Sequence, residues 1–294
     1  MKKILLIVCT VLIIAFASFC TNNQPDSLVI GMVPSTSPEM LKDNFEDIRT
    51  YLEREMSIQI ELFVPDDYKE LIAAMKTGNV DIGLYGAFSY IIADQDQDLE
   101  PLVVRERKDM GVTYNSLLIT RPDSGLDRIE DIQGLRMAFV NSASTSGYII
   151  PYALFTSRSI DIETYFRSYY FAGSHDLVVE DVIAGRTDVG AMSKSILRGL
   201  INTGRVKSDD LKIIWESEPI PGSPFIARAE LNDKIKDGFV DAMLNIHERN
   251  PEALAAYSSS LEGYVPIKTE MYNSIRNIVN VLGEDFIIEN YLGN

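Results

Sequence analysis

Short apolar segments alternate with amphipathic segments along most of this chain. Residues 28–33, 58–64 and 80–85 are short and rich in apolar side chains, which predicts strands. Between them, residues 41–56 carry apolar side chains near helical spacing, and a second helical segment follows at residues 68–76. Strands that alternate with helices build sheets covered by helices, so the sequence predicts an α/β fold with mainly parallel sheets.

Two segments are predicted to cross between two lobes. Residues 114–120 form a long predicted strand, and residues 211–215 lead into a proline-rich stretch at 218–224 that fixes an extended path. Ligands of open α/β sheets bind at the carboxyl ends of strands, so the cleft between the lobes is the expected site. The predicted division is one lobe over residues 27–117 and 219–294, and a second lobe over residues 118–218.

The first residues have the pattern of an export signal. Two lysines precede an apolar run over residues 4–19 that is too short to span a bilayer comfortably, and Cys20 follows. We therefore predict a signal peptide over residues 1–19, a lipid anchor on Cys20 and a tether over residues 20–26. The alternative is an uncleaved anchor helix, because Phe19 departs from the small residues expected before a lipidated cysteine. In both cases the remaining chain is expected outside the cytoplasm, held at the periplasmic or cell-surface face of a membrane.

Cysteine usage and charge exclude several functional classes. Cys9 and Cys20 both lie in the signal region, so the exported body has no disulfide and no thiol for catalysis or metal binding. The net charge of −16 argues against nucleic acid or an anionic membrane surface as a partner. A small anionic ligand remains compatible, because local donors set its affinity and the distant field is screened within about 8–10 Å.

A cluster of hydroxyl groups precedes a predicted helix. Ser144, Thr145, Ser146 and Gly147 lie between a strand-like stretch at residues 135–140 and an apolar helical stretch. The first turn of a helix has unpaired N–H groups and a partial positive charge. Hydroxyls add donors there, and a glycine lets an oxyanion approach the backbone. The segment is a candidate anion site, with an ordinary helix N-cap as the alternative.

Several short motifs, in this order, resemble the phosphate/phosphite/phosphonate-binding proteins of bacterial ABC importers. The order and spacing of the motifs carry the resemblance, which extends from about Val29 to the mid-260s. It implies a two-lobed periplasmic-binding-protein fold of type II. It also implies a monomeric solute-binding lipoprotein that delivers a small anion to an inner-membrane permease, without cofactor, metal or catalysis. The matching segments are residues 80–86, 114–119, 131–135, 144–151, 173–176, 185–190 and 219–224.

The resemblance also implies which residues bind the ligand. The hydroxyls of residues 144–146 would hydrogen-bond a tetrahedral oxyanion, and His175 would donate to another oxygen from the same lobe. Tyr68 and Tyr114 would close over the ligand from the opposite lobe and the crossing strand. A structural cap is the alternative for His175, and a place in the core or at the rim is the alternative for Tyr85. The predicted ligand-binding residues are Ser144, Thr145, Ser146, Gly147, His175, Tyr68, Tyr114 and Tyr85.

Two departures from the family predict the ligand's selectivity. Family members that bind an aminoalkyl phosphonate have carboxylates facing its ammonium group, and the matching residues here are Ser195 and Ser223. A buried ammonium without a counter-charge is costly. We therefore predict that the protein prefers phosphite, phosphate or methylphosphonate and rejects 2-aminoethylphosphonate.

Other functional classes fit the residues less well. A serine hydrolase could be drawn from Ser144 or Ser146 with His175, but the Gly-x-Ser-x-Gly elbow is missing and the hydroxyls are clustered. Metal capture is disfavoured because His175 and His247 are far apart in the sequence. The main alternative is a ligand-sensing protein of the same fold that signals to a membrane receptor or kinase.

Overall fold

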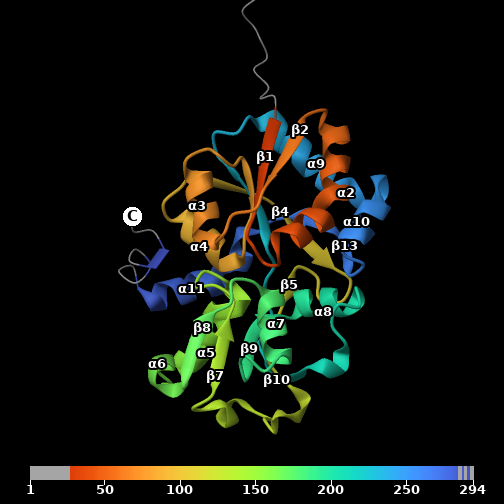
Figure 1. The fold of residues 1–294 in the computed structure, drawn as a ribbon. Coiled ribbons are helices and arrows are strands. Elements are labelled where there is room, and N and C mark those ends of the chain that lie inside the picture. Colours follow the sequence, from red (N-terminus) through yellow and green to blue (C-terminus); the bar gives the residue numbers. More distant parts are fainter. Residues whose placement is uncertain (1–26, 284–286, 288–289, 292–294) are drawn as a thin grey trace, which may run out of the picture.

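Two β-sheets, each packed against helices, form the two lobes of the protein (Figure 1). The computed structural model describes residues 27–283, 287 and 290–291. Residues 1–26 lie outside the described residues, and with them the predicted signal peptide, Cys20 and the tether. Within the described part of the chain, no helix is long and apolar enough to cross a bilayer.

The sheet of the first lobe combines parallel and antiparallel strands. From one edge to the other, its strands are β13 (Leu261–Pro266), β4 (Leu99–Arg107), β12 (Pro224–Arg228), β3 (Ile82–Leu84), β1 (Ser27–Met32) and β2 (Gln59–Phe63). β1 pairs in parallel with β2 and β3, which correspond to the first three predicted strands. β12 pairs antiparallel with β3 and β4, and β13 pairs antiparallel with β4.

The sheet of the second lobe has a similar mixture. Its strands in order are β10 (Lys212–Glu216), β6 (Ser116–Thr120), β9 (Val189–Ser193), β7 (Arg136–Phe139) and β8 (Ser168–Phe171). β7 pairs in parallel with β8 and β9, whereas β6 pairs antiparallel with β9 and β10. The prediction of mainly parallel sheets was therefore wrong. β6 and β12, the two strands that enter their sheets from the other lobe, each run antiparallel to both of their neighbours.

Helices cover both sheets, as the amphipathic segments predict. In α2, the apolar residues Leu41, Phe45, Ile48 and Leu52 are buried, and the Ser37 hydroxyl caps the helix start by accepting from the Met40 amide. The first lobe contains α2 (Pro38–Met56), α3 (Tyr68–Lys76), α4 (Ala87–Asp94), α9 (Asp233–Arg249), α10 (Pro251–Tyr257) and α11 (Asn273–Leu282). The second contains α5 (Ile150–Ser157), α6 (Ile162–Tyr165), α7 (His175–Ile183) and α8 (Lys194–Asn202).

The two crossings between the lobes are hydrogen-bonded to each other. β5 (Thr113–Tyr114) pairs antiparallel with β11 (Ile220–Pro221). Beyond β5, the Asn115 side chain donates to the Ser217 carbonyl over 2.7 Å. The long strand predicted over residues 114–120 is thus two strands, and Asn115 separates the crossing from β6. The second sheet already includes Ser116, two residues before the predicted boundary of its lobe.

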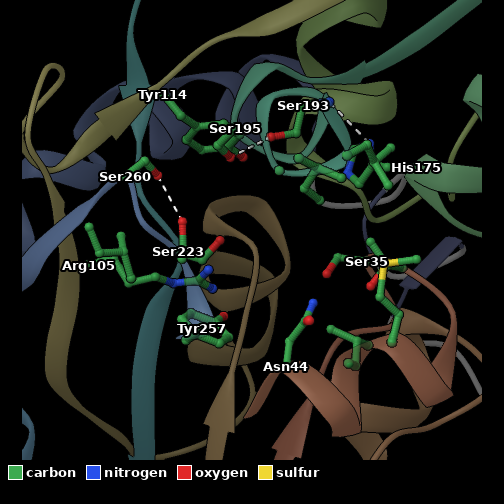
Figure 2. A pocket seen from close by; sticks show the side chains of 18 of the residues that line it. Ser35, Asn44, Arg105, Tyr114, His175, Ser193, Ser195, Ser223, Tyr257 and Ser260 are labelled. Carbon is green, nitrogen blue, oxygen red and sulfur yellow. Dashed lines mark hydrogen bonds between the residues drawn. The ribbon is translucent and has the colours of Figure 1, made fainter. Parts of the chain in front are cut away.

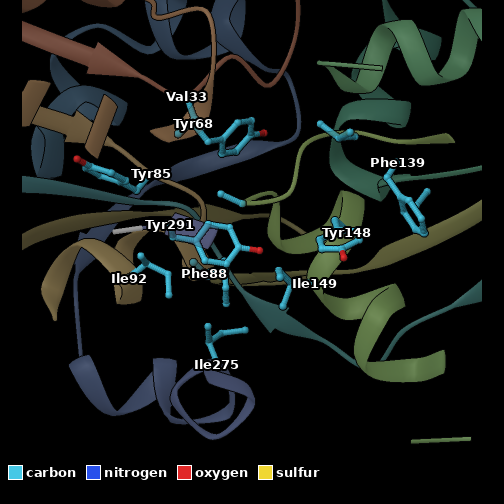
Figure 3. Close-up of a cluster of buried hydrophobic side chains, with 14 of the residues drawn as sticks. Val33, Tyr68, Tyr85, Phe88, Ile92, Phe139, Tyr148, Ile149, Ile275 and Tyr291 are labelled. Carbon is cyan, nitrogen blue, oxygen red and sulfur yellow. The ribbon is translucent and has the colours of Figure 1, made fainter. Parts of the chain in front are cut away.

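A buried apolar cluster joins the lobes beside the crossings (Figure 3). It contains Phe88 from α4 and Ile275 from α11 of the first lobe, and Phe139 and Ile149 from the second lobe. Contact of this kind removes apolar surface of both lobes from water, which stabilises the approach of the lobes. The two lobes are therefore in apolar contact beside the cleft.

Candidate functional site

A cavity of about 540 Å³ lies between the lobes (Figure 2). Its lining includes the β1–α2 connection and the first residue of α3 from the first lobe. From the second lobe it includes the predicted hydroxyl cluster and the starts of α7 and α8. The volume lies within the range of about 300–1,000 Å³ that is usual for small-molecule sites. The cavity occupies the cleft in which the sequence places the ligand.

The hydroxyl cluster lies at a π-helical turn rather than at a plain α-helix start. The turn spans Thr145–Ile149 and leads directly into α5. Pro151 has no N–H to donate to the Gly147 carbonyl, which instead accepts from the Val140 amide over 3.1 Å. The Ser146 carbonyl accepts from the Ser116 hydroxyl over 2.6 Å. These contacts with β6 and the end of β7 hold the turn in place.

All three hydroxyls of this turn line the cavity and are 2% exposed. Ser144 Oγ accepts from the Gly147 amide over 3.1 Å, and Thr145 Oγ1 accepts from the Phe88 amide over 2.8 Å. An oxygen that accepts from a backbone amide keeps its own hydrogen for another partner. Ser144 and Thr145 can therefore present O–H donors to an anion.

Two buried tyrosines add donors from the other side of the cavity. Tyr68 begins α3 and Tyr114 lies in β5, and both line the cavity together with Ser144, Thr145 and Ser146. Burial raises the pKa of both tyrosines, so the phenols stay protonated at neutral pH. The structure thus brings together the tyrosines and hydroxyls that the sequence predicts as one site.

His175 provides a neutral donor at the start of α7. Its Nδ1 accepts from the Ser193 amide over 3.1 Å, which assigns the proton to Nε2. Burial lowers the pKa of His175 to about 3, so the ring is uncharged at neutral pH. The neighbouring Asp176 does not line the cavity, and its carboxylate accepts from the Ser37 amide over 3.2 Å.

The two selectivity positions also line the cavity. Ser195 lies within 2.9 Å of the Ser193 hydroxyl, and Ser223 lies on the opposite side, near Arg105 (Figure 2). Among the described residues that line the cavity there is no aspartate or glutamate, whereas Arg105, Arg107 and Arg205 are present. The cavity is therefore positively charged in a chain of net charge −16.

Tyr85 and Gly147 were predicted at the ligand, and the structure places both outside the cavity lining. Tyr85 is fully buried in the first lobe, and its hydroxyl donates to the Leu71 carbonyl over 3.3 Å. Side chains alternate along an extended chain, and Tyr85 follows the end of β3 on its core side. Gly147 is required for packing, because a Cβ there would lie 2.4 Å from Val140 Cγ2. Its amide donates within the turn to Ser144 rather than toward the cavity.

Sequence reasoning missed Arg105 and Arg107. Both lie near the end of β4, and their side chains line the cavity. The guanidinium of Arg105 lies 5.5 Å from the ring centre of Tyr257, and that of Arg107 lies 6.0 Å from the ring centre of Tyr114. The signal in the sequence was an Arg-x-Arg spacing after an apolar run, which puts two cations on one face of a strand.

Comparisons with known proteins agree with this geometry. A family model described as "ABC transporter, phosphonate, periplasmic substrate-binding protein" matches residues 30–272. The phosphate-import protein PhnD of Mycolicibacterium smegmatis is 27% identical over 281 residues, which cover 89% of this chain and 87% of that protein. The phosphonates-binding periplasmic protein of Escherichia coli is 27% identical over 239 residues, 80% of this chain and 70% of that protein.

Solved structures agree with the fold. The binding-protein component of an ABC phosphonate transporter from Pseudomonas aeruginosa superposes with a TM-score of 0.81 at 25% identity, covering 87% of this chain and 86% of that one. The predicted two-lobed fold of type II is confirmed. The match over most of the chain, together with the cavity between two lobes, identifies it as a member of the phosphonate family of periplasmic substrate-binding proteins of ABC transporters.

Proposed function

We propose that this protein captures a phosphorus oxyanion by cleft closure and delivers it to the permease of an ABC importer. The observation that carries the proposal is the composition of the cavity. Hydroxyl, phenol and imidazole donors converge with arginines, and the described lining residues include no carboxylate. A tetrahedral oxyanion accepts hydrogen bonds in several directions, which such a set of donors can satisfy.

The phosphorus-containing group of the ligand, here called the head group, is proposed to bind between the hydroxyl turn and the two tyrosines. This place in the cavity is called the head site. Ser144, Thr145 and Ser146 donate from the second lobe, and His175 donates through Nε2. Tyr68 and Tyr114 donate from the first lobe and the crossing strand. All of these groups are neutral, so the site accepts anions of different charge.

The choice of ligand follows from the residues opposite the head group. Ser195 and Ser223 are neutral, and no carboxylate of the described lining would balance an ammonium group. The relatives' names include both phosphate import and phosphonate binding. We propose that phosphite, phosphate or methylphosphonate binds at the head site, and that 2-aminoethylphosphonate is rejected.

Closure is supported by hydrogen bonds that join the lobes around the cavity. The Phe88 amide donates to Thr145, the His175 amide donates to the Ser35 carbonyl over 3.0 Å, and the Ser37 amide donates to Asp176. A ligand that contacts both lobes favours the closed form by its difference in affinity for closed and open states. The closed form is the state that we expect a permease to recognise.

A purely binding function is also supported by the surroundings of His175. In a serine hydrolase, a carboxylate orients the histidine that activates the serine. Here the Ser193 amide occupies Nδ1, and Asp176 is engaged with Ser37. We therefore propose no covalent chemistry and no cofactor.

The family implies export to the periplasmic side. We further propose that Cys20 carries a lipid anchor at the membrane and that the mature protein works as a monomer. The alternative function, sensing the same ligand for a membrane receptor or kinase, would use the same closure. Deletion of the cognate permease distinguishes transport from sensing. If the protein serves transport, the cells lose ligand uptake, whereas a response that depends on sensing persists.

Titration calorimetry of the mature protein tests the ligand class. We expect binding of phosphite, phosphate or methylphosphonate, and at least about 100-fold weaker binding of 2-aminoethylphosphonate, since an uncompensated buried charge costs several kcal/mol. Tight binding of 2-aminoethylphosphonate would contradict the selectivity. No binding of any of the four would contradict the proposed function.

A further inference from the structure

Arg105 and Arg107 lie in the cavity without an acidic partner. They are two residues apart on β4, so their side chains project to the same face of the sheet. Among the described residues, no carboxylate lies within ion-pair distance of either guanidinium. By contrast, Arg228 on the neighbouring strand β12 pairs with Asp81 over 2.7 Å.

The donors of these arginines are only partly satisfied. Arg107 is 6% exposed, and its buried Nη1 has no hydrogen-bond partner among the described residues. Arg105 Nε is also buried without a partner in that part of the chain. The rings of Tyr257 and Tyr114 attract the two cations, but a π-face does not replace a hydrogen-bond acceptor.

The positive charges of Arg105 and Arg107 also repel each other. Burial lowers the pKa of Arg107 to about 10, and the positive charge of Arg105 contributes in the same direction. A buried guanidinium without a counter-ion is costly, and two neighbouring ones are more so. An anion in the cavity beside the two guanidinium groups would therefore stabilise them.

Arg105 and Arg107 lie next to the proposed head site, but the residues around Arg105 are not those of the hydroxyl turn. The guanidinium of Arg107 lies 6.0 Å from the ring centre of Tyr114, which lines the cavity together with Ser146 and Thr145. On the Arg105 side, the lining consists of Tyr257, Ser223 and the hydroxyl pair Ser258–Ser260 (Figure 2). The cavity of about 540 Å³ leaves room beyond a five-atom oxyanion, which fills on the order of 100 Å³ when a water molecule takes about 30 Å³.

We propose that Arg105 and Arg107 form a second anion subsite in the same cavity, which extends the ligands of the head site to phosphonates with a second anionic group on a short carbon chain. This inference rests on the proposed function, because the phosphonate end occupies the hydroxyl turn. Carboxylate and phosphonate groups both match the planar fork of a guanidinium. Methylphosphonate and phosphite occupy only the head site and leave the arginines unpaired.

Calorimetry with matched phosphonates tests the second subsite on the mature protein. The probes are methylphosphonate, ethylphosphonate, phosphonoacetate and 3-phosphonopropionate, which share the head group and differ in the tail. We expect at least one of the two carboxylates to bind about 10- to 100-fold tighter than the alkyl phosphonates, as charged hydrogen bonds of about 1.5–3 kcal/mol imply. Equal affinities would overturn the second subsite while leaving the proposed function intact. Absence of binding by all four would overturn both.

Substitution of the arginines gives a second readout. Arg105→Gln and Arg107→Gln are expected to remove the preference for the carboxylates, so that affinity for phosphonoacetate or 3-phosphonopropionate falls about 10-fold more than affinity for methylphosphonate, because only the second anionic group binds the guanidinium groups directly. Arg54→Gln, which removes one exposed charge of the same lobe, serves as the control. Equal loss of affinity for all phosphonates in the arginine variants would overturn the assignment and place the arginines at the head group.

Thermal unfolding without ligand separates binding from a structural role. If the arginines serve the ligand, Arg107→Gln leaves the ligand-free melting temperature unchanged or raises it, because a buried unpaired charge is removed. A marked fall in that temperature would overturn the ligand role in favour of a structural one. The stabilisation by phosphonoacetate should also be smaller in this variant than in the parent protein.

Discussion

The Thr145 hydroxyl accepts a hydrogen bond from the Phe88 amide, 2.8 Å away in the opposite lobe. Phe88 is the second residue of α4, so this amide is one of the helix's unpaired N-terminal donors. Thr145 therefore completes the start of a helix in one lobe and lines the ligand cavity from the other. The same side chain thus lines the cavity and joins the two lobes.

Thr145→Ala is expected to weaken phosphonate binding about 10- to 100-fold, because one donor to the oxyanion is lost. It should also lower the free energy of unfolding by about 1–3 kcal/mol, since the buried Phe88 amide loses its acceptor. Calorimetry and urea unfolding measure the two effects. Thr145→Ser keeps the hydroxyl and should recover most of both. Unchanged affinity in Thr145→Ala would contradict the anion turn.

Burial of His175 predicts a pH dependence of stability. Its pKa is about 3 in the folded protein, against an ordinary value of 6.5, so the unfolded chain binds the proton more readily. The contribution of neutral His175 to the free energy of unfolding is therefore complete above about pH 6.5. It declines as the pH falls from there toward about 3. We expect this residue to contribute a slope of up to about 1.4 kcal/mol per pH unit in that window.

Urea unfolding at pH 7, 6 and 5 isolates this contribution. His175→Gln should show a shallower decline than the parent protein, whereas His247→Gln should not differ from it, because that side chain is on the surface. An identical decline in the parent and His175→Gln would contradict the assignment of a buried, neutral imidazole.

Ser195→Glu is expected to shift selectivity toward an ammonium-bearing ligand. The new carboxylate would supply the missing counter-charge in a cavity whose described lining has none. We expect the ratio of 2-aminoethylphosphonate to methylphosphonate affinity to rise at least about 10-fold, as one charged contact of about 1.5–3 kcal/mol implies. Ser195→Gln has a similar shape without the charge and should leave the ratio nearly unchanged. A shift of equal size in both variants would show that the charge is not responsible.

Gly147→Ala should destabilise the hydroxyl turn. The added Cβ would lie 2.4 Å from Val140 Cγ2 and 2.8 Å from Ser144 Oγ, so the backbone of the turn must move. Overpacking of this kind costs about 1–3 kcal/mol in the free energy of unfolding. The double variant with Val140→Ala relieves the first contact and should recover part of the loss. Stability equal to that of the parent protein would refute the packing role of Gly147.

Local patterns predicted the α/β class, and together with the family resemblance they predicted the two-lobed fold. The apolar spacing of residues 41–56 depends on neighbours within the same helix, and its buried face follows directly. The hydroxyls of residues 144–146 are adjacent in the sequence, so any turn at this point keeps them together. Tyr68, Tyr114 and His175 came from the family resemblance, and the structure places all three around the same cavity.

The sequence did not indicate the direction of side chains at strand ends. Tyr85 follows a strand just as a cleft residue would, but its ring packs inside the first lobe and bonds Leu71. The mixed direction of the strands was also missed, because pairing between β6 and β9 or β12 and β4 joins segments far apart in the chain.

The amino-acid pattern alone indicated the alternation of strands and helices, the position of the hydroxyl turn, and the absence of cysteine after Cys20. Only the tertiary structure decided that Arg105 and Arg107 line the same cavity as that turn, without a carboxylate in the described lining. The physical reason is that secondary structure follows from interactions over a few residues. The charge and shape of the cavity depend on which faces of two lobes come together across the crossings at Tyr114 and Ile220.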